Sequence, residues 1–325
     1  MNPRYPVYVP SRGRADYSRR QTSTIGNLSR DDVPFYAVVE PQDAEAYAAV
    51  VGEDRVLVLP QRDFGILRVR NWICDHAEAS GAARHWQLDD NIKEFRRLYR
   101  GRRIPVHCGV ALRVCEDMSD RYSNVGISGL NYQMFVPDDT PKPFALNVHV
   151  YSCTLINHAM PFRYRLACNE DVDICLLALA RGWCTIALNA FMANKERTMV
   201  VKGGNTDRYL DREIPADAAP YRPDGAQAAG VTLGEGSDTK ERFDQTRLLE
   251  RAWPGLVKTS RRFGRFQHVV NWRAFADSPR LELADGVDLD ALPPVDEYGL
   301  RLREVRPVRS PTLRALLATY EEAAV

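Results

Sequence analysis

The chain has 325 residues, of which 45% are hydrophobic and 27% are charged. This composition is typical of a folded globular protein and excludes a fibrous, collagen-like or globally disordered class. The formal net charge is only +1, so any affinity for a polyanion such as nucleic acid must come from local clusters of charge.

The sequence contains no recognisable membrane or secretion signal. No stretch reaches the roughly 18 to 20 consecutive apolar residues that span a bilayer, and the first residues lack the apolar core of a signal peptide. We therefore expect no membrane partner and a cytoplasmic location. The seven cysteines include no CxxC pair and are expected to be reduced core thiols. None of the six histidines stands at the i, i+4 spacing of a helical zinc pair, and the oligomeric state is left open.

Residues 1–90 alternate short apolar runs with helical patterns. They predict strands at 5–9, 34–39, 55–59 and 85–88, separated by helices at 16–28, 43–51 and 66–79. Strands that alternate with helices favour an α/β fold, with a mostly parallel sheet flanked by helices. Such sheets bind ligands beyond the carboxyl ends of their strands, so the loops that follow these four strands are where a site is expected.

The rest of the chain mixes helices and strands before a long loop. Helices are predicted at 92–100, 106–118, 169–182 and 239–252, and strands at 122–128, 148–156 and 183–188. Residues 211–240 are rich in Pro, Gly, Ala and Asp and predict a loop or linker. The expected organisation is a main domain at 1–210, the linker, a basic helical segment at 241–276 that packs on the domain, and a C-terminal tail at 277–325.

An acidic cluster follows the predicted strand at 85–88. It consists of Asp89, Asp90 and Asn91. Hard oxygen ligands suit Mg²⁺ or Mn²⁺, which neutralises the charge of a nucleotide diphosphate. An acidic turn that caps the next helix would contain the same residues, so the cluster alone leaves both interpretations open.

The first predicted strand runs into a loop suited to an anion. The loop contains Pro10, Ser11, Arg12, Gly13 and Arg14. A glycine permits close approach of the backbone, and arginines donate planar hydrogen bonds to phosphates. A charged surface loop is the alternative. The pattern is neither a Walker A loop nor a GxGxxG motif, which disfavours an ATPase or a dinucleotide-dependent oxidoreductase.

A second candidate anion site is the start of the predicted helix at 66–79. Gly65 precedes this helix, and its first turns carry Arg68, Arg70 and Asn71. A helix N-terminus with cationic side chains attracts anions. A solvated helix face would have the same residues, so this motif needs support from the others.

Two carboxylates begin the predicted helix at 169–182. Glu170 and Asp171 follow Asn169 directly. A transferase that inverts a sugar's anomeric centre needs a carboxylate to accept the proton of the attacking hydroxyl, and a pair allows the surroundings to raise one pKa. Acidic residues also stabilise helix N-termini, and both roles can hold together.

Taken together, these motifs come in the order found in GT-A glycosyltransferases. Residues 4 to 275 resemble the TET-associated glycosyltransferases, which are phage and viral-metagenome enzymes that add a sugar to 5-hydroxymethylcytosine in DNA. The segments that carry the resemblance are YVPSRGRA, GILRVRN, WQLDDNI, HVYSCTLI, NEDVDICL, KGGNTD and WPGLVKTSRRFGRFQHVVNW. The resemblance implies a GT-A-like, Rossmann-like fold, with nucleotide-sugar binding and catalysis in residues 1–210 and a basic C-terminal extension. A phage-encoded chain would act in the host cytoplasm.

The resemblance also implies roles for individual residues. Pro10, Ser11, Arg12 and Arg14 would hold the nucleotide, and Glu40 would lie near its base. Arg70 and Asn71, beside Gly65, would lie near the ribose and the diphosphate. The metal, Mn²⁺ or Mg²⁺, would bind Asp89 and Asn91, with Asp90 beside them, and His268 is a candidate C-terminal ligand. The catalytic base would be Asp171, with Glu170 as the second choice.

A cationic stretch at 251–276 suggests contact with DNA. Lys258, Arg261, Arg262 and Arg265 could bind phosphates, and the aromatic residues between them could stack on a displaced base. A core-packing helix with a solvated basic face is the alternative. The cationic residues of 92–103 are a second candidate phosphate contact.

These features predict a metal-dependent glycosyltransferase with a UDP-sugar donor and 5-hydroxymethylcytosine in DNA as acceptor. A glycosyltransferase that acts on a glycan or small molecule would share every donor motif, and a sugar nucleotidyltransferase most of them. A non-catalytic DNA-binding module would need only the basic stretch.

Overall fold

The computed structural model describes residues 1–140, 142–196, 247–262 and 265–289, and the single residues 201, 291 and 298. Of residues 261, 262, 265 and 266 it describes the backbone alone. The predicted linker at 211–240 lies outside the described residues. Among the described residues, no helix has the length and apolar character needed to cross a bilayer.

The sheet begins with four parallel strands, as the alternating pattern predicted. These are β1 (Val7–Pro10), β2 (Tyr36–Val39), β3 (Val56–Val58) and β4 (Arg84–Leu88). They lie side by side in the order β3-β2-β1-β4. Since parallel strands end at the same edge, the loops after β1, β2 and β4 meet there.

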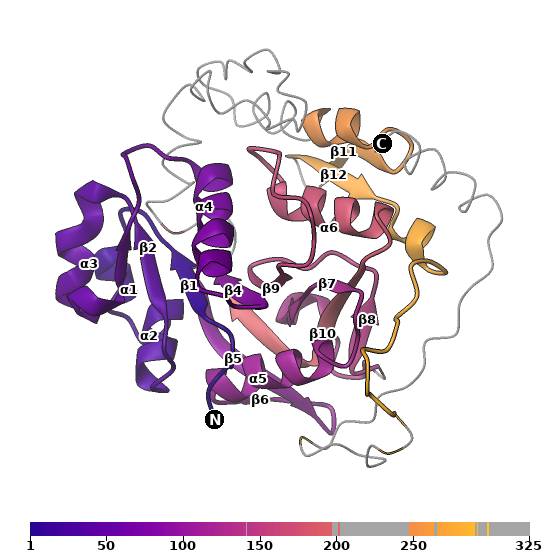
Figure 1. The fold of residues 1–325 in the computed structure, drawn as a ribbon, viewed down its shortest axis with the longest axis horizontal. Coiled ribbons are helices and arrows are strands. Elements are labelled where there is room, and N and C mark those ends of the chain that lie inside the picture. Colours follow the sequence, from indigo (N-terminus) through magenta and orange to yellow (C-terminus); the bar gives the residue numbers. More distant parts are fainter. Residues whose placement is uncertain are drawn as a thin grey trace.

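The other half of the sheet is mixed. It consists of β9 (Cys153–Asn157), β7 (Val125–Tyr132), β10 (Cys184–Lys195), β5 (Ile92–Tyr99), β6 (Arg102–Pro105) and β8 (Phe144–Leu146). Strand β9 runs antiparallel between β4 and β7, and β7 is parallel to β10. Following the pairings, seven of the ten described strands point the same way, with β9, β5 and β8 reversed. The mostly parallel, GT-A-like α/β sheet is confirmed (Figure 1).

Helices cover both faces of this sheet and make three layers (Figure 1). On one face lie α2 (Thr24–Arg30), α3 (Ala44–Val51) and α5 (Cys108–Ser119), and on the other lie α4 (Ile66–Ala79) and α6 (Glu170–Ala180). The alternation of side chains along each strand explains this division. In β1, Val7 and Val9 join the cluster around α5, whereas Tyr8 packs against α4.

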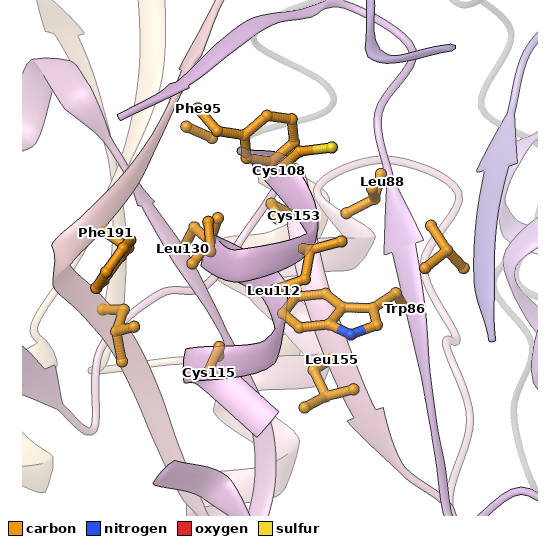
Figure 2. Close-up of a cluster of buried hydrophobic side chains, with 14 of the residues drawn as sticks. Trp86, Leu88, Phe95, Cys108, Leu112, Cys115, Leu130, Cys153, Leu155 and Phe191 are labelled. Carbon is orange, nitrogen blue, oxygen red and sulfur yellow. The ribbon is translucent and has the colours of Figure 1, made fainter. Parts of the chain in front are cut away.

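The largest core cluster lies between the sheet and α5 (Figure 2). Trp86 is fully buried there, and its indole N–H donates to the buried Glu116 at 2.8 Å. Burying an indole of this size is strongly favourable, provided that its one polar group has a partner. All seven cysteines are free and buried, which confirms the predicted reduced thiols.

The prediction of a helix at 92–100 is wrong. These residues form β5, which pairs with β6 as a hairpin. The connection is Arg100-Gly101, and both residues have positive φ angles, of 50° and 69°, as two-residue hairpin turns require. Ile92 and Phe95 are buried against α2 and α5, while the arginines lie on the partly exposed positions. The long apolar stems of the arginines suit a partly exposed strand as well as a helix.

Two other predictions about local structure need correction. The predicted helix at 16–28 is two helices, because α1 (Ala15–Ser18) ends before Ser23 caps α2 by accepting from the N–H of Gly26 at 2.9 Å. The predicted strand at 148–156 is extended only from Cys153. Short 3-10 turns complete the fold at η1 (Pro41–Asp43), η2 (Glu53–Arg55) and η3 (Gln133–Phe135).

The prediction of a helical segment at 241–276 is wrong for residues 257–270. They form a hairpin of β11 (Val257–Arg262) and β12 (Arg265–Val270), preceded by a helix whose described part is 247–252 and followed by η5 (Trp272–Phe275). Trp253 and Phe275 pack against the outer side of α6. Figure 1 shows the hairpin beside α6. The described part of the tail returns to the sheet, where Leu283 bridges to Tyr122.

Candidate functional site

The site lies where the carboxyl ends of β1, β4 and β10 meet the N-terminal turns of α4 and α6. Asp89 and Asp90 follow β4, Ser11 follows β1, and Lys195 is the last residue of β10. Arg70 comes from α4. These segments meet because the three strands are parallel and the helices run back along them.

Asp90 ties the first loop to the end of β4. Its carboxylate accepts from the hydroxyl of Ser11 at 2.5 Å and from Arg14 at 2.6 Å. The side chain is buried, and burial raises its pKa although Arg14 opposes the shift. Ser11 is also hydrogen-bonded to the hydroxyl of Tyr47 at 2.5 Å. The predicted nucleotide residues Ser11, Arg14 and Asp90 therefore form one rigid group.

The carboxylate of Asp89 pairs with two cationic side chains. Its Oδ1 accepts from Arg70 at 3.2 Å and its Oδ2 from Lys195 at 3.2 Å. Burial would raise the pKa of Asp89, but Lys195 and Arg70 outweigh it and hold the pKa below its ordinary value. The side chain remains 28% exposed, so a ligand can reach the carboxylate that both cations share.

Lys195 was not singled out by any sequence pattern, yet it lies in the site. Its ammonium group donates to Ser152 at 2.7 Å as well as to Asp89, lies 5.4 Å from the ring of Tyr151, and belongs to a residue only 7% exposed. Ser152 has a φ of 63°, a conformation that non-glycine residues adopt at a cost and that clusters at functional sites. The register shift between Asn194 and Lys195 aims the lysine at this edge.

Arg70 connects the acidic cluster to α6. Its Nε donates to Glu170 at 3.0 Å and its Nη1 to Gln87 at 3.2 Å, and it is buried. Burial raises the pKa of Glu170, and Arg70 offsets this only in part. Next to Arg70, Asn71 accepts from the N–H of Tyr164 and donates to its carbonyl, at 3.0 and 2.9 Å. Both polar groups of the Asn71 side chain are therefore hydrogen-bonded to the backbone of Tyr164.

Glu40 organises the loop before α4. Its carboxylate accepts the N–H groups of Asp63 and Phe64 at 3.0 and 2.9 Å, and it faces Arg12 at 3.2 Å. Gly65, with a φ of 80°, then starts α4. Arg12 also pairs with Asp63 at 2.5 Å. Glu40 thus links Arg12 of the first loop to the turn that precedes Gly65. The predicted contact of Glu40 with a base remains a prediction.

The predicted metal ligands would supply only part of a coordination sphere, which phosphate oxygens of a nucleotide sugar could complete. Asn91 has a buried Oδ1 with no hydrogen-bond partner, and Asp89 keeps lone pairs beyond the two that it shares. An amide and a carboxylate oxygen fit Mg²⁺ or Mn²⁺, which commonly take further oxygens from phosphates and water. Among the described residues, Asp89 has no group of two further His, Cys, Asp or Glu ligands close enough to join it.

A second group of possible ligands lies at the start of α5. Asp31, His107 and Cys108 have ligand atoms within 4.8 Å of one another. Asp31 accepts the N–H of Cys108 at 2.7 Å, and His107 accepts that of Gly109 at 3.2 Å. Both side chains thus cap α5, which explains the cluster without a metal.

Asp171 lies among aromatic side chains at the start of α6. Its Oδ2 is 3.3 Å from Nε2 of His149, whose ring stacks on Tyr151 and Trp272. His268 of β12 is close enough to interact electrostatically with both Asp171 and His149, and burial lowers its pKa. The histidine predicted as a metal ligand therefore lies beside the predicted base. Local sequence patterns did not single out His149.

The C-terminal hairpin is attached to α6 by a buried carboxylate. Asp173 accepts two hydrogen bonds from Arg165, both of 2.9 Å, and one from the indole of Trp253 at 2.7 Å. Lys258 is exposed on β11. Arg261, Arg262 and Arg265 lie on the backbone of the hairpin, and their side chains are outside the described residues.

Comparison with known proteins gives the family. The sequence model of the family described as TET-Associated Glycosyltransferase matches residues 5–204. No curated protein matches the chain. Because the match covers more than half of the 325 residues, the chain belongs to this family and is a glycosyltransferase. The matched range includes the first loop, the acidic cluster, Arg70, Asp171 and Lys195, and ends before the hairpin.

Proposed function

We propose that this member of the family transfers a sugar from a UDP-sugar to the hydroxymethyl group of 5-hydroxymethylcytosine in DNA. The observation that carries the proposal is the position of Arg70, which hydrogen-bonds to Asp89 on one side and to Glu170 on the other. One buried guanidinium thus joins the predicted donor site to the helix that bears Asp171. Donor and acceptor sites that have a residue in common lie close enough for direct transfer of the sugar between them.

The donor half supplies positive charge where a diphosphate would leave. Lys195, Arg70 and Arg14 surround Asp89 and Asp90. A preorganised cation stabilises developing negative charge without reorganising during the reaction. The first loop adds a further cation, Arg12, which pairs with Glu40.

The proposal includes a divalent cation, Mn²⁺ or Mg²⁺, held by Asp89 and Asn91. When bound, it would act as a Lewis acid on the diphosphate. The unpartnered, buried Oδ1 of Asn91 supports a role for this residue as a ligand. Asp89 would keep the metal site next to Lys195 and Arg70.

The acceptor half would receive the modified base. Asp171 is 27% exposed, whereas Glu170 is more buried and bonded to Arg70, so Asp171 is the carboxylate better placed to meet an acceptor. The basic hairpin lies on the same side, because His268 of β12 is within electrostatic reach of Asp171. A DNA strand along the hairpin could present a flipped cytosine to Asp171, or an unflipped one through the major groove.

Two alternatives share part of this evidence. A glycosyltransferase for a glycan or small molecule would use the same donor half, and only the basic hairpin argues against it. A non-catalytic DNA-binding module would need the hairpin alone, but would leave the buried network of Arg70, Asp89 and Lys195 without a purpose.

The test is release of UDP from a panel of UDP-sugars, in the presence of Mn²⁺ and either unmodified or 5-hydroxymethylcytosine DNA. We expect release only with the modified DNA, together with the matching gain in nucleoside mass. Release that does not depend on DNA would exclude the DNA acceptor. Absence of release with every sugar and either DNA would exclude the proposed transfer. Repeating the assay with EDTA and then added Mn²⁺ tests the metal.

A further inference from the structure

His149 lies in a segment whose backbone is fixed on both sides. The N–H of Asn147 donates to the carbonyl of Thr185 at 2.7 Å. The N–H of Val150 donates to the thiol sulfur of Cys175 at 3.5 Å, and that thiol donates to the Val150 carbonyl at 3.5 Å. Strand β10 and helix α6 therefore hold this non-strand segment in place. A side chain on such a support can be positioned accurately.

The imidazole ring is held between two other rings. The Tyr151 ring stacks on it at a centroid distance of 4.8 Å and an angle of 17°, and the Trp272 ring at 5.9 Å and 3°. Two stacked neighbours fix the plane of the imidazole. They leave only its edges for polar contacts, and at one edge Nε2 faces Oδ2 of Asp171 at 3.3 Å.

Asp171 has little capacity left to act as a base. Its Oδ1 accepts the N–H of Val172 at 2.9 Å, and its Oδ2 faces His149. Burial would raise the pKa of Asp171, but His149 and Arg70 outweigh it and hold the pKa far below its ordinary value. A carboxylate that holds a proton so weakly is a poor acceptor for the proton of an alcohol.

The same contact prepares His149 to accept a proton. An ionised carboxylate beside Nε2 selects the tautomer with hydrogen on Nε2 and leaves the lone pair on Nδ1. The His149 side chain is 24% exposed although Nε2 is buried. The exposed part of the side chain therefore lies away from Nε2, on the side from which an acceptor could approach.

We infer that His149 is the general base that removes the proton from the acceptor hydroxyl, and that Asp171 is its positioning residue. This inference rests on the proposed transfer and reassigns the proton within it. The acceptor oxygen forms a bond to the anomeric carbon, whose bond to the diphosphate oxygen breaks with the electron pair leaving on UDP. The hydroxyl proton moves to Nδ1, and the imidazolium formed is stabilised by Asp171 until it loses that proton to water.

The inference predicts a characteristic dependence on pH. A protonated imidazole cannot accept a proton, so the turnover rate should fall toward acidic pH. The groups that face His149 are Asp171 from α6, His268 from β12 and Tyr151 from its own segment, and Arg70 of α4 acts through Asp171. A carboxylate base would remain ionised, and the rate would persist, to much lower pH.

The experiment compares three variants with the wild-type enzyme, using the UDP-sugar and modified DNA that support turnover. His149→Asn removes the base, His149→Phe keeps an aromatic ring in the stack, and His107→Asn is the matched control at an exposed N-cap that asparagine also suits. We expect both His149 variants to lose about 10²- to 10⁴-fold in kcat, with unchanged KM for either substrate and no acidic limb in the residual rate. His107→Asn should match wild type.

Chemical rescue separates a base from a structural role. In His149→Gly, imidazole added to the solution should restore part of the rate, in proportion to its neutral fraction. His149 variants that fold, as judged by circular dichroism, and keep kcat or the acidic limb of the pH profile would overturn the inference. Wild-type protein that transfers no sugar to modified DNA would overturn the proposed function itself, and the inference with it.

Discussion

The proposed donor and acceptor halves of the site are assembled differently. The donor half, made of Ser11, Arg14, Asp89 and Asp90, comes from two loops at the ends of neighbouring parallel strands, joined by hydrogen bonds of 2.5 and 2.6 Å. The acceptor half, made of His149, Asp171 and His268, brings together an irregular segment, a helix start and the C-terminal hairpin. The first is formed within the parallel half of the sheet, where β1 pairs with β4, whereas the second depends on docking of the hairpin.

This difference implies that the two halves can be disrupted separately. The hairpin reaches the acceptor half through contacts with α6, including the bond from Trp253 to Asp173 and the stacking of Trp272 on His149. The described side-chain hydrogen bonds of Ser11 and Asp90 are made with one another, with Tyr47 and with Arg14. Damage to the hairpin should therefore weaken use of the acceptor and spare binding of the donor.

The largest effect is expected from Asp89→Ala. The substitution removes the carboxylate that Arg70 and Lys195 share and one of the two proposed metal ligands. We expect kcat to fall by about a thousandfold, as when a preorganised electrostatic group is lost, while DNA affinity is retained. Single-turnover sugar transfer and a filter-binding assay measure the two quantities. The control is Asp16→Ala, at a fully exposed aspartate near the first loop. An unchanged kcat for Asp89→Ala would show that this carboxylate takes no part in the transfer.

Asp173→Asn should separate the acceptor half from the donor half. Asp173 is buried and accepts hydrogen bonds from Arg165 and from the indole of Trp253. Breaking a buried ion pair costs about 3 to 5 kcal/mol, and the partial exposure of Arg165 places the expected loss at about 3 kcal/mol. Urea unfolding measures this loss, and limited proteolysis should show earlier cleavage within 247–275. The dissociation constant for UDP should not change. A parallel loss of UDP binding would show that the halves are not independent.

Lys195→Met tests a residue that touches both halves through Asp89 and Tyr151. Methionine keeps an apolar side chain of similar length but removes the charge, so of the two described cations Asp89 would retain Arg70. We expect kcat to fall by about a hundredfold, the lower end for loss of one stabilising group. Lys195→Arg is the matched variant, because it keeps the charge and should retain more activity. Equal losses in both variants would indicate that packing, not charge, matters at this position.

The donor half could be largely predicted from the sequence. Alternating strands and helices placed the loops after β1 and β4 at one edge, and the residues singled out there, Ser11, Arg14, Asp89 and Asp90, are in contact or adjacent. Arg70 was expected near a diphosphate, and it bonds to Asp89. This prediction succeeded because the order of strands connected by helices is strongly constrained. The residues of the site also follow directly after the apolar runs that identify the strands.

The acceptor half could be predicted only in part, because it depends on tertiary register. Lys195 was missed because β10 was predicted to end at 188, and its irregular pairing after Leu188 has no local signature. His149 lay inside a predicted strand that the structure does not contain there, and its partners Asp171 and Trp272 are distant in sequence. The strands β11 and β12 were missed because the cationic residues of this stretch were interpreted as a helical face, and the stretch lacks the alternation of apolar and polar residues that marks a strand.

The smallest predicted effect concerns Lys258, the exposed cation of β11. If the hairpin follows the DNA backbone, Lys258→Ala should weaken DNA binding by about fivefold or less, the size of an exposed ion pair. The slope of log affinity against log salt should become shallower by about 0.9, because one fewer counterion is released. Fluorescence anisotropy with modified DNA from 50 to 200 mM salt, a range over which several phosphate contacts have a large effect, measures both.

Lys142→Ala is the control for Lys258, because Lys142 is also exposed but lies in the loop before β8. It should leave the salt slope unchanged. The KM for the UDP-sugar should be the same in both variants, since neither lysine contacts the donor half. A salt slope that Lys258→Ala does not alter would place the DNA elsewhere, and the cationic strands β5 and β6 would then be the next surface to test. An effect of Lys258→Ala on the KM for the UDP-sugar would instead mean that donor and acceptor halves are coupled through the hairpin.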